Sequence, residues 1–248
     1  MNLQTASFIL REHGKDITTD KETEPMDQKT PGQAVCARCG ACCSKGGPAL
    51  HDEDHAIVDS GLLPLTSLYT IRKGELAFDN VSGGLIRLVS EIIKIKTQPD
   101  SPACMYFDEA NKSCGIYDGR PVECRILECW NTGPVESMYT RNRLTREGVL
   151  KNIPWLLELV NTHESECAMG MVQGLVEGRE AVDPDAGPRL SELVRYDLHY
   201  RELLVEKGGL PSGMMDFLFG QPLADIIPRQ FGVKVVRALP KKVHFIST

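Results

Sequence analysis

The sequence lacks features that would place it in several common classes of protein. No run approaches the roughly 18 consecutive apolar residues of a membrane helix, so we expect no membrane span. Basic residues are not in excess: 28 Lys and Arg stand against 34 Asp and Glu, which argues against a nucleic-acid partner. The N-terminus has no basic segment followed by an apolar one, so we expect no signal peptide and a cytoplasmic protein.

Motifs of familiar enzyme classes are also missing. There is no G-x-x-x-x-G-K-[ST] loop, no G-x-G-x-x-G after a strand and no G-x-S-x-G elbow. Cys36, Cys39 and Cys42 are spaced two and two, unlike the C-x3-C-x2-C run of radical S-adenosylmethionine enzymes. The sequence supports no recognisable catalytic machinery and leaves open whether the protein is an enzyme.

Cysteine is unusually dense in one part of the chain. Of the 9 cysteines, all but Cys167 lie between Cys36 and Cys129. A reducing cytosol keeps thiols reduced, and a chain of 248 residues does not need disulfides to hold a core. We therefore interpret the clustered cysteines as metal ligands. They are Cys36, Cys39, Cys42 and Cys43 in a C-x2-C-x2-C-C run, followed by Cys104, Cys114, Cys124 and Cys129.

The spacing of the first run has a physical reason. Two thiolates three positions apart in a tight turn can converge on one ion, with backbone N–H groups directed at the sulfurs. Gly40 suits such a turn because glycine accepts a positive φ. Adjacent Cys42 and Cys43 do not easily point the same way, which favours two sites or one ligand with a neighbour in reserve. Eight sulfurs divide naturally into two four-ligand sites.

The ordered motifs resemble the YkgJ-type cysteine-cluster family. The resemblance rests on the C-x2-C-x2-C-C run, followed by Cys104-Met-Tyr-Phe, Cys114-Gly-Ile-Tyr and Arg120-Pro121-Val-Glu-Cys124-Arg. It covers about residues 34–131 and implies zinc or iron chelation, with no agreed reaction. The ligands that it implies are Cys36, Cys39, Cys42, Cys43, Cys104, Cys114 and Cys124, and Cys129 is our eighth candidate.

Two metals fit these ligands. The C-x2-C-x2-C run resembles that of bacterial ferredoxins, in which three cysteines hold three corners of a [4Fe–4S] cluster, although the terminal cysteine–proline pair is absent. The Cys36-x2-Cys39-Gly segment also resembles a zinc knuckle, and thiolate sites suit zinc as well as iron. A branch of the family, the flagellin lysine methylases, is associated with iron–sulfur chemistry. We therefore expect an iron–sulfur cluster, with zinc as the alternative.

The sequence predicts a metal-binding protein that serves electron transfer or metal handling. Two alternatives stay open: a cluster-dependent enzyme that modifies a protein or small molecule, as in the methylase branch, and a purely structural zinc domain. The partner that the sequence identifies is the metal ion or cluster, and a protein partner is left open.

We expect an irregular α+β fold, organised by metal in its first half and mainly helical in its second. Residues 1–33 indicate a flexible tail, residues 34–131 the chelating domain, and residues 132–248 a helical extension with a terminal β-hairpin. Local patterns predict further elements: a helix over His51–Val58, a strand in the later half of 84–96, helical residues 150–160 interrupted at Pro154, a helix over Arg189–Lys207, and two β-prone runs in Val233–Ile246.

Three further groups of residues have a plainer explanation than a site. His51 and His55 lie four apart among carboxylates, and we favour a solvated helix start over a second metal site. Cys167, four residues after His163, indicates a buried thiol. A basic stretch indicates an exposed helix face, or at most a docking patch for an acidic partner; its members are Arg141, Arg143, Arg146 and Lys151.

Overall fold

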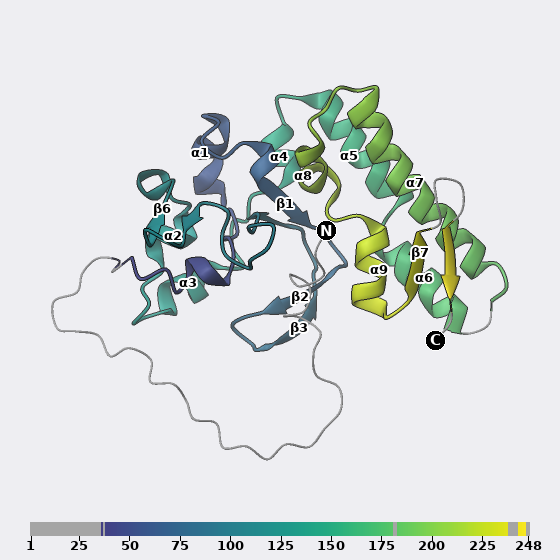
Figure 1. Ribbon diagram of the computed structural model, residues 1–248, viewed down its shortest axis with the longest axis horizontal. Coiled ribbons are helices and arrows are strands. Elements are labelled where there is room, and N and C mark those ends of the chain that lie inside the picture. The colour runs from purple at the N-terminus through teal and green to yellow at the C-terminus, as the bar shows by residue number, and fades with distance from the viewer. Residues whose placement is uncertain (1–35, 37, 181–182, 238–242, 247–248) are drawn as a thin grey trace, which may run out of the picture.

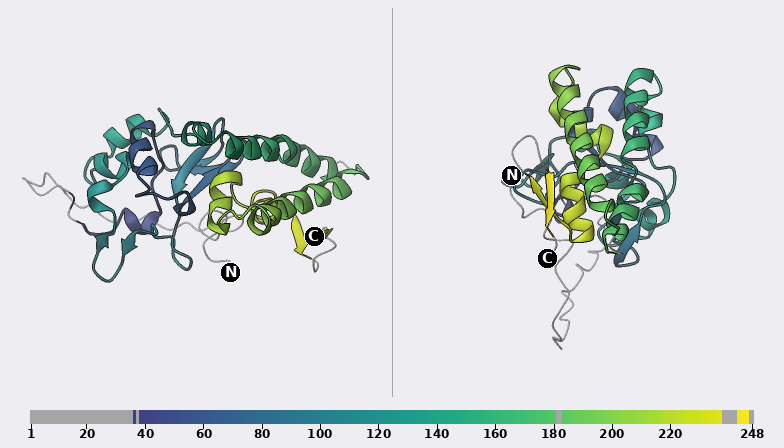
Figure 2. Two further views of the ribbon diagram at one scale, coloured as in Figure 1. Left: turned by 90° about the horizontal axis from the view of Figure 1, so that it is seen from above. Right: turned by 90° about the vertical axis from the view of Figure 1, so that its right-hand side faces the viewer.

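The computed structural model describes residue 36 and residues 38–180, 183–237 and 243–246 (Figure 1). The predicted tail, residues 1–33, lies outside these ranges. The described chain mixes helices with two-stranded antiparallel sheets, which confirms an α+β fold. Figure 2 shows an elongated arrangement, with the cysteine-bearing segments at one end and the long helices at the other.

The central sheet joins β1 (Leu68–Ile71) to β4 (Ile92–Ile95), with Leu68 opposite Ile95. Ile92, Ile93 and Ile95 are buried, and this apolar run confirms the strand predicted in the later half of 84–96. The first half of that segment also forms a strand, which the sequence analysis missed. That strand, β3 (Gly84–Arg87), pairs with β2 (Leu76–Asp79) in a separate hairpin.

Two smaller strand pairs complete the described sheets. β5 (Phe107–Asp108) pairs with β6 (Ser113–Cys114) inside the cysteine-rich region. β7 (Lys234–Arg237) pairs with β8 (Val243–Ile246) in the segment with the two β-prone runs, with Lys234 opposite Ile246.

Short helices lie in the first part of the chain and long ones in the second. A 3₁₀ turn (Asp52–Asp54) precedes α1, so the helix predicted over His51–Val58 begins later than expected. The helices before residue 151 are α1 (His55–Asp59), α2 (Val122–Ile126), α3 (Gly133–Met138) and α4 (Arg146–Leu150). The later ones are α5 (Pro154–Glu166), α6 (Met169–Glu180), α7 (Ala186–Glu206), α8 (Met215–Phe219) and α9 (Leu223–Phe231).

Two of the helix predictions are confirmed by these boundaries. Pro154 interrupts the helical pattern as expected, because it is the first residue of α5, where its missing N–H is not needed. α7 contains the predicted Arg189–Lys207 helix almost entirely and starts at Ala186. None of the described helices is long and apolar enough to cross a membrane.

The first hydrophobic core lies between the central sheet and the helices α4, α5 and α8. Leu68, Ile93 and Ile95 of the sheet meet Leu150 and Phe217 there. Residues on both sides of position 131 contribute to this core, so the two proposed parts of the chain share it.

Arg146 belongs to this buried region, which corrects one expectation. Its guanidinium lies 2.6 Å from a Glu91 carboxylate oxygen and 2.8 Å from one of Glu164, and only 5% of the residue is exposed. The prediction of an exposed basic face is therefore wrong at Arg146, because acidic partners from distant segments draw this side chain inward.

A second core lies among α6, α7 and α9. Its fully buried members are Cys167, Val172, Leu190, Val194, Leu223, Ile226 and Ile227. Cys167 is 0% exposed, which confirms the predicted buried thiol.

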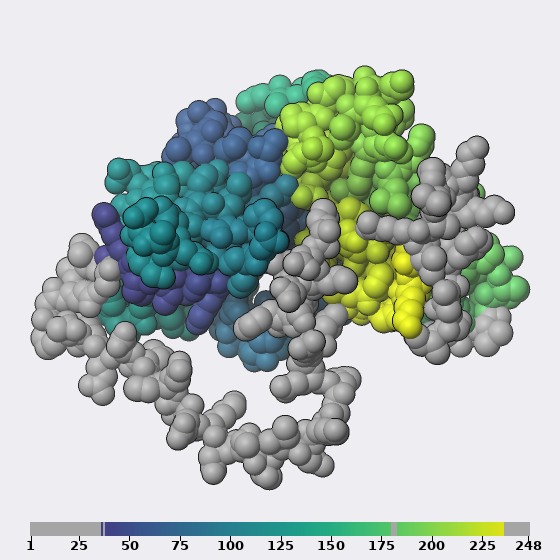
Figure 3. All heavy atoms as spheres, viewed as in Figure 1, coloured from purple at the N-terminus to yellow at the C-terminus, as the bar shows by residue number. Residues whose placement is uncertain are grey.

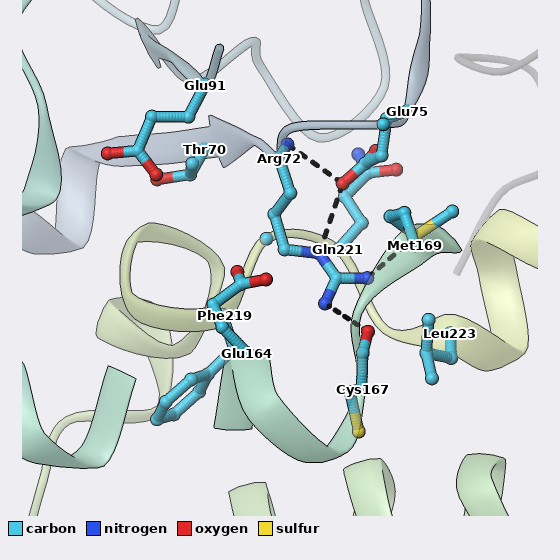
Figure 4. Close-up of polar contacts among 12 residues, drawn as sticks. Thr70, Arg72, Glu75, Glu91, Glu164, Cys167, Met169, Phe219, Gln221 and Leu223 are labelled. Atoms are coloured by element: carbon cyan, nitrogen blue, oxygen red, sulfur yellow. Dashed lines mark hydrogen bonds and ion pairs between the residues drawn. The ribbon is translucent and has the colours of Figure 1, made fainter. Parts of the chain in front are cut away.

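Arg72 connects the sheet to the helical half, as Figure 4 shows. Its buried guanidinium pairs with Glu75 and donates to the Cys167 carbonyl oxygen at 3.1 Å and to the Met169 sulfur at 3.0 Å. Because a buried charge is costly unless it is paired and hydrogen-bonded, these contacts fix how the two halves meet.

Candidate metal centre

The first cysteine segment is a tight loop closed by its own backbone. The Ser44 N–H donates to the Gly40 carbonyl oxygen at 2.9 Å, and Cys43–Lys45 form a 3₁₀ turn. The Arg38 N–H donates to the Cys36 sulfur at 3.3 Å, so a backbone N–H is directed at the sulfur of a predicted ligand, as the spacing led us to expect.

Gly40 holds this loop against the aromatic ring of Phe107. Gly40 has φ +81°, and a Cβ at this position would lie 2.3 Å from Cζ of Phe107. Only glycine fits both the backbone conformation and this close approach. The loop is thereby seated on β5, next to the second cysteine group.

The hairpin of β5 and β6, together with the segment just before it, supplies two further thiols. The Cys104 N–H donates to the Cys43 carbonyl oxygen at 2.7 Å, and Cys114 lies opposite Phe107 in the hairpin. Cys104 is buried in the first core, and Cys43 and Cys114 pack against that core. These three thiols, from segments 61 to 71 residues apart, therefore meet at the edge of the first core.

Cys124 lies on α2, and side chains from the segment around α1 fix this short helix. A carboxylate oxygen of Asp54 accepts the Val122 N–H at 2.8 Å, and Glu123 accepts the Ala49 N–H at 2.8 Å. His51 Nε2 lies 3.1 Å from the other oxygen of Glu123. These contacts position the helix, and the Cys124 thiol lies within electrostatic reach of Cys104, Cys42, Cys43 and Cys114.

The pKa values of the thiols report how closely they lie together. Burial, and then the neighbouring Cys42, raise the pKa of Cys43 to about 12. Burial and nearby thiols, Cys104 first, also raise the pKa of Cys124, and burial raises that of Cys104. The thiols thus favour the protonated state until a cation arrives, and metal binding would release protons.

Cys129 lies just after α2 and is exposed, as are Cys36 and Cys39. Burial, followed by Cys42, Cys39 and Cys36, raises the pKa of the Cys129 thiol. Cys129 is therefore close to the first loop rather than isolated. Figure 3 shows the purple surface of the first cysteine segment next to the teal surface of the second.

All eight predicted ligands thus lie at one end of the molecule, and each is a free thiol. Within the described residues, no three His, Cys, Asp or Glu side chains surround one point closely enough to hold a metal ion as they stand. The metal-organised part of the predicted fold is therefore not shown. The donor chemistry does fit a thiophilic metal, because reduced cysteine is the ligand that zinc and iron–sulfur clusters prefer.

The sequence did not predict which charged side chains lie near the thiols. Burial lowers the pKa of half-buried Lys94 of β4. Glu123, Cys124 and Cys104 partly oppose this effect, so the Lys94 ammonium lies near the cluster. The Tyr117 ring carries two guanidinium groups, Arg38 at 3.9 Å and Arg120 at 3.7 Å. Both positions adjoin cysteine motifs, but sequence alone gives no sign that they meet.

The two histidines do not form a second metal site. His51 is fully buried and contacts Glu123 and the Arg141 carbonyl oxygen, whereas His55 lies 3.5 Å from Asp59. His55 therefore fits the expected helix start. The expectation of a solvated position is wrong for His51, because Glu123, from a segment 72 residues away, packs against its ring.

The comparisons with known proteins agree with this chemistry. Residues 35–144 match the sequence profile of the family CxxCxxCC, described as "Putative zinc- or iron-chelating domain". The matched segment includes every cysteine of the cluster. No curated protein and no solved structure matched the chain.

Proposed function

We propose that the protein binds iron, as an iron–sulfur cluster, or zinc, through the thiolates of Cys36, Cys39, Cys42, Cys43, Cys104, Cys114, Cys124 and Cys129. The observation that carries this proposal is the gathering of free thiols from three distant segments at one end of the fold. Cys167, the remaining cysteine, lies in the second core and takes no part.

Iron–sulfur chemistry is the form we favour. The C-x2-C-x2-C spacing of the first run supports it, as do the free thiols, which a reducing cytoplasm would maintain. The role we propose is electron transfer or metal handling, because exposed cysteines at the cluster leave it accessible to a partner.

The pocket on the helical half gives the enzyme alternative no support, because it lies away from the thiols. It has a volume of about 370 Å³, is lined by residues such as Arg201, Glu202, Met215 and Asp216, and includes no cysteine. A cluster-dependent reaction needs a substrate space beside the metal.

A structural contribution is supported by the core. Cys104 is buried in the first core and Cys43 and Cys114 pack against it, so metal bound there would join the loops to that core. Removing the metal with a chelator should then lower the melting temperature, since metal-binding free energy becomes folding free energy.

The proposed function is tested on protein purified without oxygen. Iron, sulfide and zinc are measured together with the visible spectrum. We expect near-stoichiometric metal; a brown protein with broad visible absorption indicates a cluster, and a colourless one indicates zinc. The Cys167→Ala variant serves as the control and should retain the metal. Absence of both metals from the wild type would contradict the proposal.

A further inference from the structure

The adjacent cysteines Cys42 and Cys43 lie in different surroundings. Cys43 packs against the first core together with Cys104 and Cys114, whereas Cys42 is not among the described residues of that core. Their sulfur atoms are 3.8 Å apart, close enough to touch but attached to neighbouring Cα atoms of a tight turn. The cluster therefore divides between these two residues.

An inner group of four thiols consists of the three that belong to or pack against the first core, together with Cys124. Cys43 and Cys104 are joined by the hydrogen bond between their backbones, and Cys114 belongs to the hairpin that follows Cys104. The electrostatic neighbours of Cys124 are Cys104, Cys42, Cys43 and Cys114. The inner group is thus Cys43, Cys104, Cys114 and Cys124, none of which is exposed.

An outer group of four thiols lies on the solvent side. Cys36, Cys39 and Cys129 are all exposed, and Cys42 is partly buried. The cysteines that act on Cys129 are Cys42, Cys39 and Cys36, with no member of the inner group. Cys42 neighbours both groups, because it acts on Cys43, Cys104 and Cys124 as well as on Cys129. We assign it to the outer group, since the inner group already has four thiols.

The inner group also has a cation nearby. Lys94 lies near Cys104 and Cys124, whereas the guanidinium of Arg38, in the loop of the outer group, stacks on the Tyr117 ring. A divalent ion or [4Fe–4S] cluster held by four thiolates carries net negative charge, which a nearby cation stabilises. Lys94 therefore favours a charged centre at the inner thiols.

We infer that the chain holds two four-thiolate metal centres, an inner one on Cys43, Cys104, Cys114 and Cys124 and an outer one on Cys36, Cys39, Cys42 and Cys129. The inference rests on the proposed function and assigns each ligand within it. The inner centre is retained as part of the core, whereas the outer centre is the exchangeable one that meets a metal donor, acceptor or redox partner.

The neighbouring variants Cys42→Ser and Cys43→Ser test the division. Zn²⁺ is added to anaerobically reduced, metal-free full-length protein, and bound zinc is counted after gel filtration. Wild type should bind two ions per chain, and each variant should keep about half of that amount. Cys167→Ala is the matched control and should bind as much as wild type.

Release of zinc to a chelator distinguishes the two remaining centres. Wild type should release zinc in two phases, the slow one at least about tenfold slower because buried elements open less often. Cys42→Ser should show only the slow phase and Cys43→Ser only the fast one. If Cys43→Ser does not fold, Cys39→Ser provides a second outer variant and should match Cys42→Ser.

Other outcomes separate the two proposals. Wild type that binds a single ion, or releases both in one phase, overturns the two-centre inference and leaves the proposed function standing. The same follows if Cys42→Ser and Cys43→Ser lose the same phase. Wild type that binds no metal contradicts the proposed function itself.

Discussion

Both ring nitrogens of buried His51 face oxygen acceptors. Nε2 lies 3.1 Å from the Glu123 carboxylate and Nδ1 lies 2.7 Å from the Arg141 carbonyl oxygen. A neutral imidazole has one N–H, so both contacts are satisfied when the ring is protonated. Burial alone would lower the pKa of His51, but Glu123 and the Arg141 carbonyl outweigh it and raise the pKa.

The His51→Gln variant should therefore be less stable, by about 2–3 kcal/mol at pH 6, because it removes a charge-assisted hydrogen bond to Glu123. A group with a raised pKa stabilises the fold fully below its ordinary pKa, here 6.5, and loses this contribution as pH rises through the raised value. Urea unfolding at pH 6 and pH 8 should show a smaller difference between wild type and variant at pH 8. A difference that grows with pH would contradict protonation of His51.

Gly40→Ala should loosen the first cysteine loop. The new methyl group would meet the Phe107 ring and would also have to adopt a positive φ. Gly61 has φ +78° with no atom nearby, so Gly61→Ala is a control for backbone strain alone, about 1 kcal/mol. We expect Gly40→Ala to cost more stability than Gly61→Ala and to lower metal retention after dialysis. Equal effects of the two variants would mean that contact with Phe107 does not hold the loop.

Tyr117→Leu should free Arg38 from its aromatic contact. Two guanidinium groups lie within 4 Å of the ring, and each cation–π contact contributes about 0.5–2 kcal/mol. Because Arg38 is exposed, we expect trypsin to cleave after it several-fold faster in the variant. Tyr139→Leu is the control, since Arg143 lies 5.8 Å from the Tyr139 ring. Unchanged cleavage after Arg38 would show that the stack does not restrain the loop.

The sequence predicted elements whose signals are local. α7 and the start of α5 follow from periodic apolar residues and from Pro154, all within the elements themselves. The partners of Arg146 and His51 could not be predicted, because Glu91 and Glu123 reach them from distant segments. β3 was missed because its side chains are largely exposed and give no alternating pattern.

For the site, the sequence predicted the candidate ligands but not how they are arranged in space. Spacing in the first run and the family resemblance predicted eight cysteines as ligands, because the order of such motifs is visible along the chain. Which thiols face the core depends on the seating of Gly40 on Phe107 and on the contacts of α2. These are tertiary contacts, and no pattern in the cysteine segments encodes them.

Asp197 holds together the helical half of the molecule. It is fully buried, and its carboxylate contacts His163 at 2.8 Å, Arg201 at 2.7 Å and the Leu223 N–H at 2.8 Å. Burial opposes its charge, but these donors lower the pKa of Asp197 to about 2. The stabilisation of the fold by ionised Asp197 is fully present above the ordinary pKa of 3.8 and is lost as the pH falls towards 2.

Asp197→Asn should destabilise the protein by about 3–5 kcal/mol at neutral pH, because Arg201 keeps a buried charge without its partner. The loss should shrink on acidification below pH 4, as followed by circular dichroism during urea unfolding. Glu192→Gln, at an exposed position of the same helix, is the control and should change stability by less than about 0.5 kcal/mol. A variant as stable as wild type at pH 7 would refute this role of Asp197.

X-ray absorption at the edge of the metal that co-purifies with the anaerobic wild-type protein tests thiolate ligation most directly. The account predicts a shell of sulfur atoms alone, at about 2.3 Å, with no nitrogen or oxygen ligand. A shell dominated by nitrogen or oxygen would show that the clustered cysteines are not the ligands.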